Sequence, residues 1–147
     1  MKINDVFDMM RNAGINIAAN YIFGLPMDTQ ESMQNTLEFA KDNLSEMVNL
    51  YCAMAYPGSP LHLEAKKNNW QLPTTYSGYS QHAYDTLNLQ NEKLSSSEIL
   101  AFRDKAWMEY HKNKDYLSLI ENKFSFNARR DIEQTTKIKL KRKLIGD

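Results

Sequence analysis

The chain has 147 residues, of which 42% are hydrophobic and 24% are charged, so it is long enough to bury the core of one globular domain. Its 18 basic and 18 acidic side chains balance, which argues against nucleic acid or a membrane surface as a partner. A single cysteine excludes an internal disulfide framework and favours a reducing, cytoplasmic compartment. No apolar stretch approaches the length that a membrane span needs.

The first 45 residues predict a helix, a strand and a second helix. A helix is expected over residues 4–13, because Gly14 supplies a good stop after it. The nearly continuous apolar run 15–23 predicts a strand that is buried on both faces. After a Gly-Leu-Pro turn, Asp28 and Glu31 form a capping box, which indicates the start of the next helix.

The following segment repeats this order. Residues 47–54 predict a second buried strand, and a Pro-Gly turn leads to Ser59 and Pro60, which are typical of a helix N-terminus. Alternating strands and helices favour an α/β fold with a parallel sheet and right-handed crossovers. Both turns are therefore expected at one edge of one sheet, where parallel α/β proteins bind ligands.

The second half of the chain lacks this alternation of predicted strands and helices. Residues 71–91 predict a long aromatic-rich loop, with a short strand expected at 83–89. A capping box of Ser95 and Glu98 begins a helix that runs to about residue 111, and a further helix is expected over 115–123. The remaining segment, 127–143, reads as a basic tail. Residues 121–147 contain 8 basic and 4 acidic side chains, so the surplus positive charge lies there.

The two turns carry a family resemblance. The segments IFGLPMDT (residues 22–29) and AMAYPGSPL (residues 53–61) together resemble the last third of the radical S-adenosylmethionine barrel, in the branch that often carries a cobalamin-binding domain. Met27 and Asp28 stand where that family usually has glycine and glutamate. The resemblance implies the last two βα units of a partial (β/α)6 TIM-like barrel over residues 1–70, with a mostly helical C-terminal extension over residues 71–147.

The resemblance also implies which cofactors the parent enzyme uses. These are S-adenosylmethionine, a 4Fe-4S cluster and, in part of the branch, cobalamin. The cluster requires three cysteines in a CxxxCxxC loop, whereas this chain has only Cys52, inside an expected strand. The chain is therefore expected to be a C-terminal fragment that needs a missing N-terminal barrel portion, or a separate chain, and to be inactive alone.

Eight residues are the candidate contributors to the S-adenosylmethionine and small-molecule substrate pocket. They are Asn20, Ile22, Gly24, Leu25, Pro26, Tyr51, Tyr56 and Pro57. No residue is assigned as acid, base or nucleophile, and the scattered histidines indicate no metal site. Other interpretations stay open: an ordinary strand-to-helix turn at Gly24, hydrogen bonds between strands for Asn20 and Asn49, and a non-catalytic remnant or small α/β binding module that packs on a partner chain.

Overall fold

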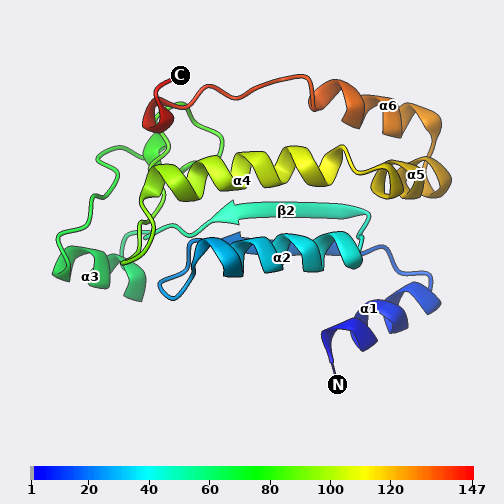
Figure 1. Cartoon of the computed structure of the whole chain (residues 1–147), viewed down its shortest axis with the longest axis horizontal. Helices are drawn as coiled ribbons and strands as arrows, with labels where there is room; N and C mark the ends of the chain where they lie inside the picture. The colour runs from blue at the N-terminus through cyan, green and yellow to red at the C-terminus, as the bar shows by residue number, and fades with distance from the viewer. Residues whose placement is uncertain (1) are drawn as a thin grey trace.

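The computed structural model describes residues 2–147 (Figure 1). Its regular elements, in chain order, are α1 (Ile3–Asn12), β1 (Ala18–Phe23), α2 (Gln30–Asp42), β2 (Met47–Cys52), α3 (Pro60–Lys67), α4 (Ser96–His111), α5 (Lys114–Lys123) and α6 (Phe126–Thr135). Short 3-10 turns occur at Ser77–Tyr79 and Lys143–Ile145. Within residues 2–147 no helix combines the length and the hydrophobicity needed to cross a membrane.

The two strands pair in parallel, as the sequence predicts. Ala18 lies opposite Met47 and Phe23 lies opposite Cys52, with α2 as the crossover between them. The last residues of the two strands, Phe23 and Cys52, lie side by side. The turns that follow, at Gly24 and at Pro57-Gly58, therefore lie at the same edge of the sheet. The described residues therefore form a mixed α/β structure around a parallel sheet of two strands.

Only one face of this sheet is covered. Met33 and Leu37 of α2 and Ile99 of α4 pack with Val48 and Leu50 in the main core. Side chains of a strand alternate between its two faces, and on the opposite face Ile22 and Met47 are 46% and 55% exposed. The prediction that both strands are buried on both faces is therefore wrong, because no helix of the described chain covers the second face. This open face consists of Ala18, Asn20, Ile22, Met47, Asn49 and Tyr51.

The two edges of the sheet differ as well. At the outer edge of β2, the guanidinium of Arg103 donates to the Leu50 carbonyl at 2.7 Å. The side-chain amide of Gln81 bonds both backbone groups of Cys52. At the other side of the sheet, β1 has no strand neighbour in the described part of the chain. The loop and α4 thus close one edge and leave the other free.

The N-cap residues of α3 and α4 are those predicted from the sequence, whereas those of α1 and α2 differ from the prediction. Ser59 caps α3 and Ser95 caps α4 with Glu98 completing its capping box, as predicted. In α2, however, Thr29 is the cap and Ser32 completes the box. Lys2 is at the cap position of α1, although the sequence predicted Asn4 as the cap of this helix. In α2 the shift reflects competition between neighbouring polar side chains for the same free N–H groups. Lys2 has no acceptor, and at the start of α1 the Asp5 carboxylate accepts from Lys2 N–H at 2.8 Å.

The long loop contains no strand at 83–89, contrary to the sequence prediction. It is instead fixed by single contacts: Leu87 N–H donates to Gly78 O, and Leu89 N–H donates to Ala53 O, each at 2.9 Å. A strand needs a continuous neighbour for its ladder, and this segment finds only isolated acceptors. Leu89 and Asn88 are nevertheless buried, so the loop is an ordered part of the core.

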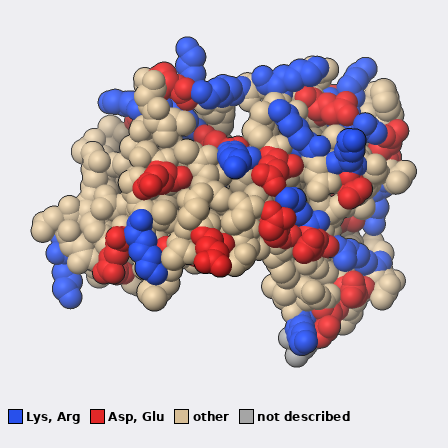
Figure 2. Space-filling model, viewed as in Figure 1, with Lys and Arg blue, Asp and Glu red and all other residues tan. Residues whose placement is uncertain are grey.

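The C-terminal segment forms α6 and then returns along α4, whereas the sequence indicated only a basic tail (Figure 1). Its anchor is Arg142, which is fully buried and bonds both oxygens of Asp104 at 2.9 and 3.0 Å. Figure 2 shows lysine and arginine side chains gathered along the upper border of the molecule, over α6 and this tail. The ion pair of Arg142 with Asp104 therefore anchors the end of the tail, together with Leu144, which packs against the main core.

Candidate functional site

A hollow of about 270 Å3 lies where the two strands end. Its walls come from the ends of β1 and β2, from the start of α3 and from the long loop. The lining residues are Ile22, Leu25, Tyr51, Cys52, Ala53, Met54, Tyr56, Leu61 and Gln81. This sheet-edge hollow is continuous with the open face, because Ile22 and Tyr51 belong to both.

Four of the eight predicted site residues line the sheet-edge hollow, namely Ile22, Leu25, Tyr51 and Tyr56. Asn20 lies one step earlier on the open face, where its side-chain oxygen accepts a hydrogen bond from the Asn49 amide at 2.9 Å. The remaining three predicted residues, Gly24, Pro26 and Pro57, belong to the same turns but are not part of its wall.

Gly24 is needed for packing within the chain. Its φ is +80°, and a Cβ at this position would lie 2.6 Å from Cγ2 of Ile99. Glycine alone combines this left-handed backbone with such close contact. The approach of α4 to the turn therefore explains Gly24 without a ligand, which was the open alternative for this residue.

The turn after β1 is held in place by side chains on both sides. The Asp28 carboxylate accepts a hydrogen bond from Leu25 N–H at 2.9 Å. The Asn91 amide donates to the carbonyls of Leu25 and Asp28 at 2.9 and 3.2 Å. Leu25 is thus presented to the hollow by a backbone that is fixed at both its N–H and its C=O.

The eight predicted site residues include none from the long loop, although the loop contributes to this wall. Gln81 bonds Cys52 N–H and C=O at 3.0 and 2.9 Å. The ring of Tyr79 stacks on that of Tyr56, with centroids 5.9 Å apart and planes inclined by 26°. The aromatic content of the loop was the only signal in the sequence, and it does not indicate which strand the loop contacts.

The chemistry of the hollow is that of a binding wall. Its side chains are apolar apart from two tyrosine hydroxyls and the Gln81 amide, which is already engaged. Burial of the Cys52 side chain in the core raises the pKa of its thiol to about 12. Nothing in this lining is therefore poised for acid, base or nucleophilic catalysis.

The residues present do not fit an iron–sulfur cluster. Such a cluster is held by several thiolates, whereas the one thiol of this chain is buried and protonated. Among residues 2–147 no three His, Cys, Asp or Glu side chains converge in a way that would hold a metal ion. No step of radical formation is therefore assigned to this chain.

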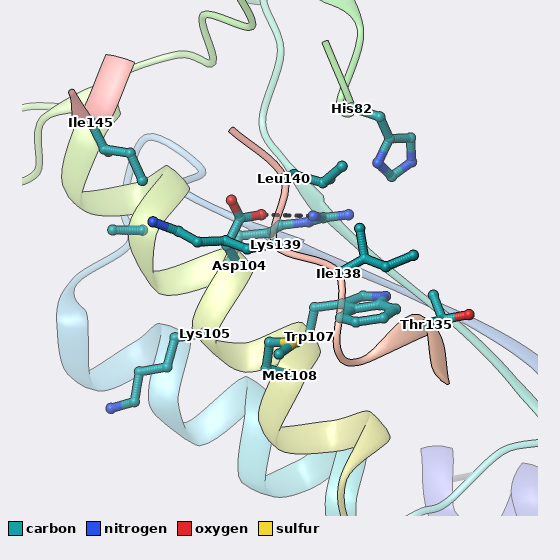
Figure 3. Close-up of a pocket in the computed structure, with 12 residues that line it drawn as sticks. His82, Asp104, Lys105, Trp107, Met108, Thr135, Ile138, Lys139, Leu140 and Ile145 are labelled. Atoms are coloured by element: carbon teal, nitrogen blue, oxygen red, sulfur yellow. Dashed lines mark hydrogen bonds and ion pairs between the residues drawn. The ribbon is translucent and has the colours of Figure 1, made fainter. Parts of the chain in front are cut away.

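A second, larger cavity of about 700 Å3 lies between α4 and residues 135–145 (Figure 3). His82, which the sequence placed in an aromatic loop, lines this cavity and not the sheet-edge hollow.

No protein-family model matches the chain, and no curated protein matches it either.

Proposed function

We propose that this chain is the C-terminal part of a radical S-adenosylmethionine barrel. It supplies one wall of the pocket for S-adenosylmethionine and substrate, and an N-terminal barrel portion or a separate chain supplies the remaining strands and the cluster loop. The observation that carries the proposal is the open face of the sheet, which runs into an apolar hollow at the C-terminal edge of two parallel strands. Parallel α/β proteins bind their ligands at this edge.

The size of the sheet-edge hollow supports a partial site. Pockets for small molecules commonly measure roughly 300–1,000 Å3 and enclose most of the ligand, whereas this hollow measures about 270 Å3. An adenine ring prefers flat apolar and aromatic surfaces, which Tyr51, Tyr56 and Ile22 offer here. A facing element would complete the enclosure.

The free edge of β1 supports the position of the missing strands. Ile17 O and Phe23 O accept from Met47 N–H and Ala53 N–H of the β2 side. In a strand, alternate residues direct their N–H and C=O groups to opposite edges, so Ala18, Asn20 and Ile22 present theirs away from β2. A partner strand parallel to β1 would pair with these three residues.

Nuclear magnetic resonance of the 15N-labelled chain tests the binding wall. We expect S-adenosylmethionine at millimolar concentration to shift the amide signals of Ile22, Leu25, Tyr51 and Tyr56 in a saturable manner. Affinity should be weak, because half of the enclosure is absent. Tyr51→Ala should abolish these shifts, whereas Tyr76→Ala, at a side chain that is 95% exposed, should leave them unchanged. Shifts confined to other regions, or none, would contradict the proposal.

A second candidate function is a non-catalytic remnant or small α/β binding module that packs on a partner chain. It is favoured by Gly24, whose conformation is explained by contact with Ile99 and requires no ligand. The neighbouring reading frame separates the two candidates. An upstream frame with βα units and a CxxxCxxC loop would support the split enzyme, and its absence would support the remnant or module.

A further inference from the structure

The larger cavity lies under the returning tail, and we refer to it as the α4–tail groove. Figure 3 shows the tail crossing α4, with Ile138 and Leu140 on the tail and Trp107 and Met108 on the helix. The tail is fixed at both ends of this crossing, by α6 on one side and by buried Arg142 on the other. An occupant must therefore be small enough to fit between helix and tail.

The end of this groove holds more buried positive charge than negative charge. The side chains of Arg103, in the groove wall, and Arg142, behind it, are 5% and 0% exposed, and both pair with the single carboxylate of Asp104. Arg142 also donates to the carbonyls of Gln81 and Ala83. Two guanidinium groups thus share one counter-ion. A buried charge without a full counter-ion is unfavourable, so this end of the groove attracts an anion.

Arg103 also has an unused donor. Its Nε donates to Leu50 O at 2.7 Å and its Nη1 donates to Asp104 at 2.8 Å. Its Nη2 makes no hydrogen bond to another residue of the described chain, and Arg103 is part of the groove wall. A guanidinium N–H without a partner in a groove wall is a strong hydrogen-bond donor for a carboxylate.

Next to this guanidinium, His82 lies at the groove wall without adding to the charge. Partial burial lowers the pKa of His82, and the positive charges of Arg103 and Arg142 lower it further. The imidazole is therefore neutral at pH 7 and available as a hydrogen-bond partner.

Most of the remaining groove wall is apolar, although Lys105, Thr135 and Lys139 also contribute to it (Figure 3). Trp107 is held by a stack on His111, with ring centroids 4.2 Å apart. Ile138 and Leu140 of the tail remain 65% and 40% exposed, although they line a cavity. Apolar side chains that line a groove yet stay accessible are typical of a binding surface.

We propose that the α4–tail groove binds a small carboxylate with an extended apolar body, such as a medium-chain fatty acid. The carboxylate pairs with Arg103 Nη2 and His82, and the apolar body lies between Trp107, Met108, Ile138 and Leu140. The cavity of about 700 Å3 lies within the common range for such ligands, roughly 300–1,000 Å3. This inference is independent of the proposed barrel function, because no residue lines both the groove and the sheet-edge hollow.

Decanoate is the probe, and the fluorescence of Trp107 in a Trp70→Phe chain is the signal. We expect saturable binding below the concentration at which decanoate forms micelles. Decanol has the same chain without the charge and should bind about ten- to a hundredfold more weakly, as expected for loss of a charge-assisted hydrogen bond. Butyrate keeps the charge and loses most of the apolar contact, so it should also bind weakly.

A pair of tail variants tests the position of the site. Leu140→Glu puts a carboxylate into the groove at an accessible residue and should abolish decanoate binding. Lys137→Glu changes the charge of the same segment outside the lining and should reduce binding only slightly. Equal binding of decanol and decanoate, unchanged binding by Leu140→Glu, or absence of saturation would overturn the proposal. Binding to phosphatidylglycerol vesicles without binding of decanoate would also overturn it, in favour of a membrane surface.

Discussion

The carboxamide of Gln81 pairs with Cys52 as a neighbouring strand would. Its oxygen accepts from Cys52 N–H at 3.0 Å and its nitrogen donates to Cys52 O at 2.9 Å. One side chain from a loop thus satisfies both backbone groups at the outer edge of β2. The same contact places the loop against the sheet-edge hollow, so Gln81 both protects β2 at Cys52 and forms part of the wall of the hollow.

Gln81→Ala should lower the free energy of unfolding by about 1–3 kcal/mol, because two part-buried backbone groups lose their partners. It should also accelerate amide exchange at Cys52 by loosening the loop. Gln71→Ala is the matched control, since Gln71 is exposed. Chemical denaturation and amide exchange measure both effects. Unchanged exchange at Cys52 would mean that another contact holds the loop.

Gly24→Ala should destabilise the chain more than Gly58→Ala. Both glycines have left-handed backbone, with φ of +80° and +85°, but a Cβ at Gly58 would have no atom within 4 Å. Gly58→Ala should therefore cost only the conformational strain of about 1–2 kcal/mol. Gly24→Ala adds overpacking against Ile99, which commonly costs about 1–3 kcal/mol more.

A double-mutant cycle identifies the contact responsible. Ile99→Ala removes the side-chain atoms that would lie closest to the new Cβ. In that background, Gly24→Ala should cost no more than Gly58→Ala does in the parent chain. A cost that stays equally large without the Ile99 side chain would assign the effect to the backbone alone. Urea denaturation of the variants provides the comparison.

Glu46 should make stability depend on acid pH. Burial by itself raises the pKa of Glu46, but the hydrogen bond from Ile17 N–H and the ion pair with Lys123 bring that pKa below its ordinary value of 4.5. A folded-state pKa below the unfolded value stabilises the protein above about pH 4.5, and this stabilisation is lost as pH falls through the folded-state pKa.

Glu46→Gln should consequently be less stable than the parent chain at pH 7, and the difference should shrink on acidification. Glu64→Gln, at an exposed residue of α3 with no ion pair among residues 2–147, should show no such trend. Thermal unfolding between neutral and acid pH measures both variants. A difference that is constant with pH would mean that the carboxylate charge of Glu46 contributes nothing.

Cys52 should be inert to thiol reagents in the folded chain. Its side chain is buried, and burial raises the pKa of the thiol to about 12, so at pH 8 only about one molecule in ten thousand carries the thiolate. Ellman's reagent should react with one thiol per chain in guanidinium and with almost none in buffer. Rapid reaction in buffer would show that the end of β2 opens easily.

Amide exchange should distinguish the two edges of β1. Ala18, Asn20 and Ile22 direct their N–H groups away from β2, and within the described chain no strand covers that edge. Their amides should exchange much faster than those of Ala19 and Tyr21, which face β2. Slow exchange of all five, together with a larger apparent mass in size-exclusion chromatography, would instead indicate that copies of the chain associate through this edge.

Local sequence patterns were sufficient for the order of elements and for several boundaries. The apolar stripe of Met33, Leu37 and Ala40 is buried in α2, and Ser59 and Ser95 cap their helices as predicted. The parallel pairing of the strands also followed from the alternation of strand and helix. These features depend on contacts between residues a few positions apart, or on the geometry of the crossover connection. Both can be predicted from the local sequence pattern.

The sheet-edge hollow was predictable in part. Ile22, Leu25, Tyr51 and Tyr56, which the family resemblance implied as pocket residues, lie together in its wall because the two strands end at one edge of the sheet. Gln81 was not foreseen, because it lies 29 residues from Cys52 in sequence and no local pattern links a loop amide to a particular strand. The contact of Gly24 with Ile99 was not foreseen either, because the two residues are far apart in the sequence. Gly24 suggested a ligand site in the sequence, whereas in the structure it is required for packing against Ile99.

The sequence by itself therefore determined the βα order, the parallel sheet and the edge at which its two turns lie. Only the tertiary structure decided which face of the sheet stays open, which edge is closed by Gln81 and Arg103, and how Arg142 ties the tail across α4. The physical reason is sequence separation. Strand and helix periodicity reflect neighbours within a few residues, whereas a buried charge or a loop amide finds its partner only when distant segments are packed together.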